Sequence, residues 1–270
     1  MEARQSEIHD YLAFAERLAD AARAETVPRF RTQAAVINKA RASFDPVTDA
    51  DRDAERALRR LINETFPDHG VIGEEFGAER ADAPWRWVLD PVDGTRAFIC
   101  GVASWATLIA LEKDAASVLG VIDQPFTDER WIGAGRDTVY RRAGMERRCR
   151  TSGVRDLDKA RISTTDPRAT GYFLPEEANA FNRLADGARV ARFSLDAYGY
   201  GLLALGEIDL VVEASLKRHD FAALIPVIEG AGGVVTGWRG EALGDSERGR
   251  IVAAATPELH QAALEFLREV

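Results

Sequence analysis

Residues 85–142 contain five short apolar runs in close succession, and their spacing limits the folds that this chain can adopt. The runs are rich in β-branched and aromatic residues, and turn-length polar pieces separate them: WRWVLD, WATLIALE, SVLGVIDQP, ERWIGA and TVYRR. A βαβ crossover needs a dozen or more connecting residues, which these gaps do not provide. The spacing therefore favours an antiparallel meander over βαβ units in this part of the chain.

Apolar residues occur at helical spacing before the meander. They predict an amphipathic helix over 6–25, for which Ser6 is a suitable N-cap, and a second helix that stops before Pro67. After the meander, candidate strands alternate with candidate helices. The strands are ARISTT, ARVARFS, DLVVEA, GVVTGW and RIVAAA, and the helices cover 196–206, 220–231 and 257–269. This alternation indicates a layered α/β arrangement.

The length of 270 residues allows one large domain or two closely joined halves. We place the boundary in the polar, turn-rich segment near residues 145–158. The expected organisation is an N-terminal α+β half, 1–145, with the antiparallel sheet and most of the candidate metal ligands. A C-terminal α/β half, 146–270, follows and holds the substrate-recognition residues and the last metal ligand.

Charge and cysteine content exclude several classes of function. The formal net charge is −9, whereas binding to a nucleic-acid backbone needs a basic surface, so we expect no nucleic-acid partner. There is no apolar stretch of roughly 18 residues and no secretory signal at the N-terminus, which predicts no membrane association. The cysteines, Cys100 and Cys149, cannot form a disulfide framework and fit a reducing cytoplasm. Cys100 is expected in the core.

Acidic residues are concentrated in four places. These are DPVTDAD at 45–51, GEEFG at 73–77, LDPVDGT at 89–95, and Asp220 at the start of an apolar run. Structural roles are available for three of them. Acids favour the first turn of a helix, an acidic pair between glycines suits an exposed turn, and Asp220 suits an N-cap. These structural interpretations stay open beside the functional ones.

The segment LDPVDGT is harder to explain by structure alone. Asp90 and Asp93 flank Pro91, which disfavours helix at the preceding residue, and Gly94 permits an unusual backbone angle or a close approach. Two carboxylates this near each other repel unless a cation or a shared proton intervenes. Carboxylate oxygens suit Mg²⁺ or Mn²⁺, and a pair of such ions can clamp a phosphoryl group. An ordinary Asp-Gly turn is the structural alternative.

The motifs GEE and LDPVDGT, followed by a late aspartate that opens a helix, resemble those of the inositol monophosphatase family of Mg²⁺-dependent phosphatases. The resemblance runs from DPVTDAD to EGAGGVV. It implies a layered αβαβα sandwich of the type shared with fructose-1,6-bisphosphatase, and a small-molecule phosphate monoester as substrate. It also implies two or three Mg²⁺ ions, with Mn²⁺ as an alternative, and a homodimer.

The resemblance extends to individual metal ligands. Glu74, Asp90 and the carbonyl of Val92 resemble ligands of the tighter ion. Asp93 and Asp220, with Asp90 bridging, resemble ligands of a second ion. A third, weaker ion is implied near Glu74.

The same resemblance implies a catalytic group of Glu74, Thr95 and Asp51. Thr95 and Asp51 match the pair that orients the attacking water. The backbone amides of Gly94 and Thr95 would hold phosphate oxygens, as amide groups at helix N-termini and nests do. No covalent enzyme intermediate is implied.

Longer stretches, among them GTRAFICG, GVIDQP and SLKRHDFAALIPVIEGAGG, resemble the histidinol-phosphatase branch of the family. Inositol-type members usually have Trp where this chain has His219, which is expected as a pocket-wall or hydrogen-bonding residue. Glu213 matches a position that faces the alcohol portion of the substrate, and Asp196 stands where inositol-type members carry a small residue. A second carboxylate there would suit an ammonium or imidazolium group, unless Asp196 merely caps the following helix. The favoured reaction is hydrolysis of L-histidinol phosphate, a step of histidine biosynthesis.

Three alternative functions stay open. One is an inositol-1-monophosphatase. Another is a broader sugar or nucleotide phosphatase, in which Arg192, Lys217 and Arg218 could bind a second phosphate group. The last is an inactive homologue with a binding or regulatory role, against which the complete set of acids argues.

Overall fold

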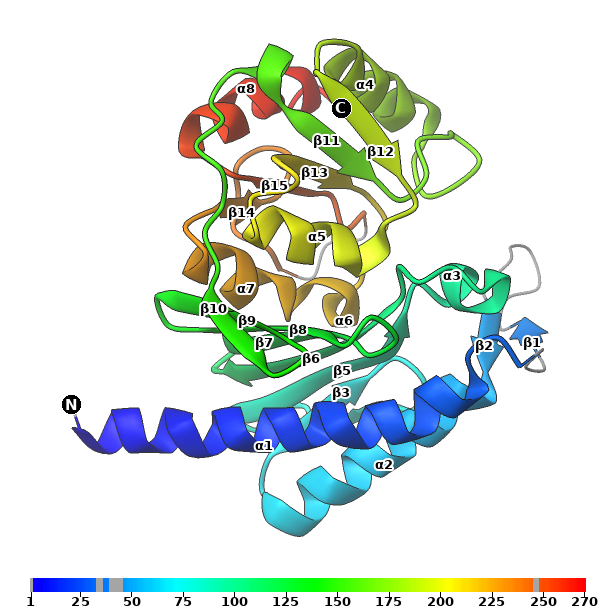
Figure 1. The fold of residues 1–270 in the computed structure, drawn as a ribbon, viewed down its shortest axis with the longest axis vertical. Coiled ribbons are helices and arrows are strands. Elements are labelled where there is room, and N and C mark those ends of the chain that lie inside the picture. Colours follow the sequence, from blue (N-terminus) through cyan, green and yellow to red (C-terminus); the bar gives the residue numbers. More distant parts are fainter. Residues whose placement is uncertain (1, 33–35, 39–45, 245–247) are drawn as a thin grey trace.

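The computed structural model describes residues 2–32, 36–38, 46–244 and 248–270. Its elements are stacked in layers, which Figure 1 shows from the side: helices, a β-sheet, helices, a second β-sheet and helices again. The helical layers consist, from bottom to top, of α1 (Glu2–Thr26) and α2 (Asp49–Thr65), of α5 (Asp196–Ala204), α6 (Arg218–Phe221) and α7 (Leu224–Gly230), and of α4 (Pro175–Asp186) and α8 (Pro257–Leu267). This arrangement confirms the expected αβαβα sandwich.

The first sheet has eight strands in the order β10-β9-β8-β7-β6-β5-β3-β4. From β5 to β10 each strand pairs antiparallel with the next along the chain, which confirms the meander, whereas β3 runs parallel to β5. The strands are β3 (Gly70–Gly73), β4 (Gly77–Glu79), β5 (Trp85–Asp93), β6 (Ala106–Lys113), β7 (Ala116–Gln124), β8 (Glu129–Ala134), β9 (Asp137–Arg142) and β10 (Met145–Arg148). Since β10 belongs to this sheet, the sheet continues past residue 145. The division of the chain into two halves stays a prediction.

The second sheet has five strands in the order β12-β11-β13-β15-β14. Strands β12 and β13 run parallel to β11, while β15 runs antiparallel to both β13 and β14. Its strands are β11 (Arg161–Thr164), β12 (Val190–Phe193), β13 (Leu210–Glu213), β14 (Val234–Thr236) and β15 (Ile251–Ala254). A short helix, α3 (Thr95–Cys100), follows β5, and a two-stranded hairpin, β1 (Val36–Asn38) and β2 (Pro46–Thr48), precedes α2.

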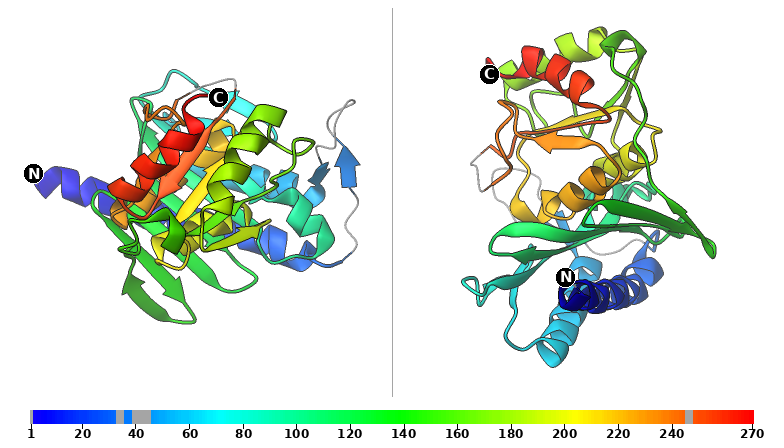
Figure 2. Two further views of the ribbon diagram at one scale, coloured as in Figure 1. Left: turned by 90° about the horizontal axis from the view of Figure 1, so that it is seen from above. Right: turned by 90° about the vertical axis from the view of Figure 1, so that its left-hand side faces the viewer.

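The first sheet is covered by helices on both faces, as the right-hand view of Figure 2 shows. Strand β6 illustrates why its sequence is continuously apolar. Leu108 packs in a core with α5 and α7, whereas its neighbour Ile109 packs in a core with α1 and α2. Successive side chains of a strand point to opposite faces, so a strand between two helical layers needs apolar residues at every position.

The structure corrects several expectations about single elements. Helix α1 begins at Glu2, so Ser6 is not its N-cap; the residues before Ser6 include good helix formers that extend the helix. The helix expected over 220–231 is divided into α6 and α7, and this division places Pro226 in the first turn of α7, where a missing N–H is tolerated. Cys100 is exposed rather than in the core, since it is the last residue of the short helix α3.

Two further observations concern the cysteines and membrane-spanning helices. Cys100 and Cys149 are both free thiols, and burial raises the pKa of Cys149 to about 12. Within the described ranges, no helix combines the length and apolar character needed to cross a membrane.

Candidate active site

The two aspartates of LDPVDGT lie at the buried end of β5. Asp90 is opposite Leu108 of β6, and Asp93 is opposite Ala106, so three steps along β5 correspond to two steps along β6. The extra residue makes a β-bulge. In a regular strand, residues three apart point to opposite faces, but the bulge brings Asp90 and Asp93 to the same face of the sheet.

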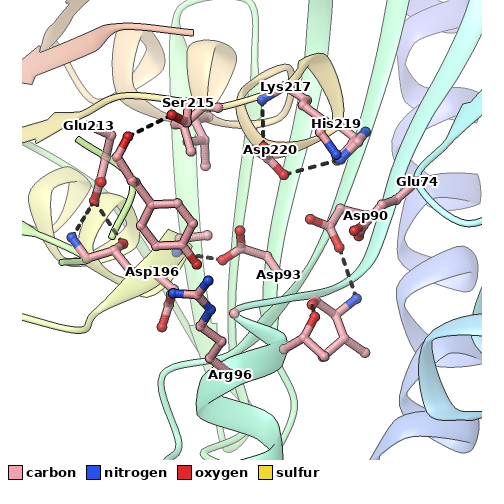
Figure 3. Close-up of a pocket in the computed structure, with 18 of the residues that line it drawn as sticks. Glu74, Asp90, Asp93, Arg96, Asp196, Glu213, Ser215, Lys217, His219 and Asp220 are labelled. Carbon is pink, nitrogen blue, oxygen red and sulfur yellow. Dashed lines mark hydrogen bonds and ion pairs between the residues drawn. The ribbon is translucent and has the colours of Figure 1, made fainter. Parts of the chain in front are cut away.

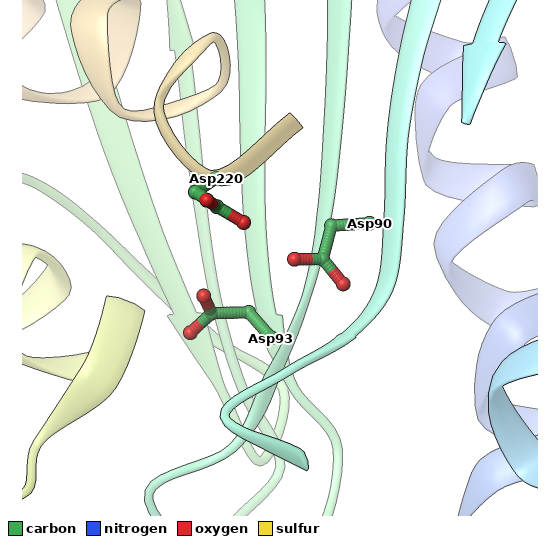
Figure 4. A group of neighbouring side chains, drawn as sticks. All are labelled: Asp90, Asp93 and Asp220. Atoms are coloured by element: carbon green, nitrogen blue, oxygen red, sulfur yellow. The ribbon is translucent and has the colours of Figure 1, made fainter. Parts of the chain in front are cut away.

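A third aspartate joins this group from the other end of the sequence. Asp220 lies in α6, and single carboxylate oxygens of Asp90, Asp93 and Asp220 all lie within 4.8 Å of one another (Figure 4). Asp220 is not the N-cap that the sequence suggested. It is the third residue of α6, and its Oδ2 accepts a 2.6 Å hydrogen bond from the backbone N of Lys217, which is the N-cap. This bond fixes the side chain that completes the three-aspartate group.

Burial and repulsion act together on these carboxyl groups. Burial is the largest cause that raises the pKa values of Asp90 and Asp93 well above their ordinary range; the charge of Glu74 adds to the shift of Asp90, and that of Asp196 to the shift of Asp93. Burial also raises the pKa of Asp220. A divalent cation among these three carboxylates would offset this repulsion. An all-oxygen donor set suits a hard ion, so the residues fit Mg²⁺ or Mn²⁺.

The three aspartates face a cavity of about 350 Å³ (Figure 3). Glu74 and Val92 line the same cavity. Glu74 lies beside Asp90 in Figure 3. Among the described residues, however, the group of carboxylates that lie within 4.8 Å of one another contains the three aspartates and not Glu74. His219 is a wall residue, as expected, and its Nε2 lies 3.4 Å from Oδ1 of Asp220.

Thr95 and Asp51 come together beside this group. The Oγ1 atom of Thr95 lies 3.4 Å from Oδ1 of Asp51 and 3.1 Å from the carbonyl oxygen of Val92, so the hydroxyl can donate to either. The other carboxylate oxygen, Oδ2, accepts hydrogen bonds from the backbone N and the hydroxyl of Thr48, the N-cap of α2. Asp51 therefore combines the capping role with the contact to Thr95. Burial raises the pKa of Asp51 to about 6.

Gly94 joins β5 to α3 in a conformation that requires glycine. Its φ is +77°, and a Cβ at this position would lie 2.9 Å from Cγ of Asp196. Asp196 does not cap α5, because Leu195 is the N-cap and makes no side-chain cap bond. Instead, Oδ2 of Asp196 accepts a 3.1 Å hydrogen bond from Ser104, and the residue lines the cavity. Burial raises the pKa of Asp196 to about 6.

Glu213, at the end of β13, lines the cavity on the side away from Glu74 (Figure 3). Its Oε1 accepts hydrogen bonds from the backbone N and the hydroxyl of Thr165 at 2.7 and 2.9 Å, and Oε2 accepts one from Thr164 at 3.2 Å. Burial is nevertheless the largest influence and raises the pKa of Glu213 to about 8. The cavity thus holds two carboxyl groups besides the three aspartates: Asp196, which is close enough to Asp93 to raise its pKa, and Glu213, on the side away from Glu74.

This combination of fold and acidic residues matches a known family. The sequence profile of the inositol monophosphatase family matches residues 7–270. The chain belongs to this family. It is 39% identical over 276 residues to the bifunctional phosphatase IMPL2, chloroplastic, of Arabidopsis thaliana, covering 98% of this chain and 77% of the relative. It is 35% identical to the histidinol-phosphatase of Mycobacterium tuberculosis, covering 87% and 90%.

A solved structure supports the same membership. The inositol monophosphatase from Zymomonas mobilis superposes with a TM-score of 0.85 at 42% identity, covering 96% of this chain and 98% of that one. The chain is therefore a phosphomonoesterase of the inositol monophosphatase family. The family is generally metal-dependent, and the three-aspartate group is the acidic cluster of this member.

Sequence reasoning did not identify every cavity residue of this inositol monophosphatase family member. Arg96, Tyr172 and Ser215 also line the cavity. The guanidinium carbon of Arg96 lies 4.8 Å from the ring centroid of Tyr172, whose carbonyl accepts a 2.7 Å hydrogen bond from Ser215. Arg96 directly follows Thr95, and that position was a usable signal. Tyr172 and Ser215 lie in irregular segments, and nothing in their local sequence marks them.

The basic residues considered for a second phosphate group are not brought together. Lys217 lines the cavity. Arg218 instead donates a 2.7 Å hydrogen bond from Nε to Glu112, and Arg192 is exposed on β12. A bisphosphate site built from these three residues is therefore not formed.

Proposed function

We propose that this phosphatase hydrolyses L-histidinol phosphate with the help of Mg²⁺. The observation that carries the proposal is a pair of carboxyl groups, Asp196 and Glu213, that line the same cavity as the three aspartates but lie outside their metal-binding group. A phosphate ester would extend from the acidic metal centre toward this pair. An amino alcohol with a cationic group would place its positive charge next to the pair, whereas a neutral polyol would not.

The metal would be held by the carboxylates of Asp90, Asp93 and Asp220, with Glu74 and the carbonyl of Val92 as further ligands. Bound Mg²⁺ supplies charge neutralisation at the phosphoryl group and acidifies water. The protein contributes a rigid arrangement, since the bulge in β5 and the hydrogen bond from the backbone N of Lys217 to Asp220 fix the aspartates before any ion binds.

Thr95 and Asp51 have the geometry to orient a water molecule toward phosphorus. With its pKa near 6, Asp51 is mostly ionised at neutral pH and can accept the hydroxyl proton of Thr95 in a hydrogen bond. The lone pairs of Thr95 Oγ1 then face the incoming water and accept a hydrogen bond from it, which orients the water. The backbone amides of Gly94 and Thr95 are proposed to hold phosphate oxygens.

The charge of the alcohol side of the cavity depends on pH. At pH 7 Asp196 is ionised, while the pKa of Glu213 near 8 leaves that group mostly protonated in the absence of a cation. An ammonium or imidazolium group beside Glu213 would favour its ionised form. The M. tuberculosis relative named histidinol-phosphatase supports this substrate at the level of family branch.

A second candidate substrate is inositol 1-phosphate. The Z. mobilis structure, at 42% identity, is named as an inositol monophosphatase. One feature of the cavity also favours a neutral alcohol. The charge of Arg96 lowers the pKa of Asp196. The guanidinium therefore offsets part of the negative charge of Asp196 that would attract a cationic substrate.

A panel of phosphate esters distinguishes these candidates. We expect L-histidinol phosphate to have the highest kcat/KM in Mg²⁺, compared with inositol 1-phosphate, glycerol 2-phosphate and fructose 1,6-bisphosphate. A higher kcat/KM for inositol 1-phosphate would reject the histidinol assignment but keep the metal-dependent chemistry.

The substitution Asp196→Asn tests recognition of the cation directly. We expect kcat/KM for L-histidinol phosphate to fall about tenfold or more, which is about 1.4 kcal/mol of lost ion pairing, with less than a threefold change for glycerol 2-phosphate. Equal losses for both esters would show that Asp196 does not recognise the cation.

The homodimer, the cytoplasmic location and the absence of nucleic-acid partners stay predictions, and the A. thaliana relative is named as chloroplastic.

A further inference from the structure

The hairpin that carries Glu74 is tied to helix α2 by a buried ion pair. Glu55 and Arg59 lie one turn apart on α2, with side chains that are 0% and 8% exposed, and Nε of Arg59 donates a 2.7 Å hydrogen bond to Oε1 of Glu55. Charged side chains are rarely this deeply buried without a partner that compensates for lost hydration.

Both members of the pair bind the backbone of the GEEFG turn. Oε2 of Glu55 accepts a 2.7 Å hydrogen bond from the amide of Glu75, and Oε1 accepts one of 3.2 Å from the amide of Phe76. Arg59 donates to the carbonyl oxygen of Gly77 and, at 2.9 Å, to Glu79. The turn between β3 and β4 is therefore folded around a carboxylate that comes from another element.

The first glycine of the motif makes this contact sterically feasible. A Cβ on Gly73 would lie 2.0 Å from Oε1 of Glu55 and 2.8 Å from a guanidinium nitrogen of Arg59. Any side chain at this position would push the turn away from α2. The backbone N of Glu74 also donates a 3.3 Å hydrogen bond to the carbonyl oxygen of Leu89 on β5, so the ion pair acts mainly on the part of this short edge hairpin that follows Glu74.

The position of the pair on α2 connects it to the rest of the site. Asp51, Glu55 and Arg59 are four residues apart in turn, so they follow one face of the helix. Asp51 contacts Thr95 at the beginning of this face, while Glu55 and Arg59 hold the Glu74 turn further along it. One helix thus sets the positions of two parts of the candidate site.

We infer that Glu55 and Arg59 are positioning residues that fix the turn after Glu74 and thereby hold Glu74 in place for metal binding. This inference rests on the proposed role of Glu74 as a metal ligand. Neither residue lines the cavity, so their effect passes through the turn. Partners that orient metal ligands commonly contribute 10–100-fold to metal affinity.

The test is a titration of the metal-free full chain with Mn²⁺ alone. Electron paramagnetic resonance measures the concentration of unbound Mn²⁺ and so gives the Kd. We expect Glu55→Gln to raise the Kd for Mn²⁺ about tenfold or more. Hydrogen–deuterium exchange of the peptide over 73–77 should also accelerate, because one accepting oxygen is replaced by a donor. A Kd within twofold of wild type, with unchanged exchange, would overturn the inference.

The chain offers a matched control for loss of a buried carboxylate. Asp209 directly precedes β13 of the second sheet, whereas the GEEFG turn belongs to the first sheet. Asp209 is buried and accepts hydrogen bonds from the backbone N and the guanidinium of Arg161. Asp209→Asn should destabilise the protein but leave the Kd for Mn²⁺ and the exchange of 73–77 unchanged. If it weakens Mn²⁺ binding as much as Glu55→Gln does, the effect is general destabilisation and the inference fails.

Further variants separate this inference from the proposed function. Once Glu74→Gln has weakened Mn²⁺ binding, adding Glu55→Gln should cause little extra loss, because both act through one ligand; full additivity would contradict the inference. If Glu55→Gln does not fold, Arg59→Lys replaces it in the test. This variant keeps the positive charge but loses the guanidinium nitrogen that donates to Gly77, so it should still raise the Kd for Mn²⁺ severalfold. Unchanged Mn²⁺ binding in Asp93→Asn would instead overturn the proposed metal site itself.

Discussion

At the scale of single residues, the bulge between Asp90 and Asp93 determines what LDPVDGT can do. Their three-residue spacing would separate the two carboxylates onto opposite faces of a regular strand. The sequence indicated a turn at Pro91 but not a bulge, because the register depends on the partner strand β6. The acid cluster could be predicted from the motif. Its exact partner, Asp220 of α6, came only from the family resemblance.

Glu213 provides a residue-scale prediction about pH. Its pKa rises from an ordinary 4.5 to about 8 on folding, so the folded protein binds a proton that the unfolded chain has released. The contribution of this proton to the free energy of unfolding is complete below about pH 4.5 and is lost as pH rises toward 8. In metal-free protein, the free energy of unfolding of wild type should therefore fall over this window relative to Glu213→Gln, by up to roughly 5 kcal/mol.

Urea denaturation of both proteins at pH 5, 6.5 and 8 measures this difference. Glu213→Gln keeps the shape of the side chain but cannot titrate, so a difference in pH dependence between the two proteins comes from the charge of Glu213 and not from packing. Parallel pH dependences of the two proteins would show that Glu213 is not the group responsible.

At the scale of elements, α1 is joined to the first sheet by a buried ion pair. Asp123 of β7 is fully buried, and accepts hydrogen bonds from Arg23 of α1 at 2.7 and 2.8 Å and from Arg130 of β8 at 2.6 Å. Periodicity predicted α1 and its apolar face, because burial of one face repeats every turn. The ion pair could not be predicted, since its partners are 100 residues apart in sequence.

Asp123→Asn should destabilise the protein by about 3 kcal/mol, because it leaves two arginines without their shared buried carboxylate. The matched control is Asp128→Asn, since Asp128 accepts a 2.7 Å hydrogen bond from the same Arg23 but has a 59% exposed side chain. That variant should change the free energy of unfolding by less than about 1 kcal/mol. Both should retain kcat/KM within twofold. Equal destabilisation in the two variants would contradict the importance of burial.

At the scale of the whole molecule, the three-aspartate group joins distant parts of the fold. Two of its carboxylates come from the first sheet and one from the middle helical layer. The meander and the layered α/β arrangement of the later residues were predictable from the sequence pattern, whereas the complete αβαβα sandwich came from the family resemblance. Irregular parts such as the segment with Tyr172 were not, since long-range packing rather than local pattern determines them.

A metal bound across these elements should stabilise the entire fold. At a free Mg²⁺ concentration of 100 times Kd, the expected gain is about 2.7 kcal/mol, and the Tm should rise by roughly 5 °C or more relative to EDTA. Thermal unfolding followed by circular dichroism measures this shift. Asp93→Asn should show a much smaller rise, and in EDTA it should be at least as stable as wild type, because it removes a repelling charge.

The most direct test of the proposed function is phosphate release from L-histidinol phosphate by wild type and Asp93→Asn, each in Mg²⁺ and in EDTA. Wild type should turn over only in Mg²⁺, while Asp93→Asn should lose at least a thousandfold in kcat/KM and keep the circular dichroism spectrum of the folded protein. Magnesium-independent turnover by wild type, or full activity of Asp93→Asn, would contradict a reaction centred on the three aspartates.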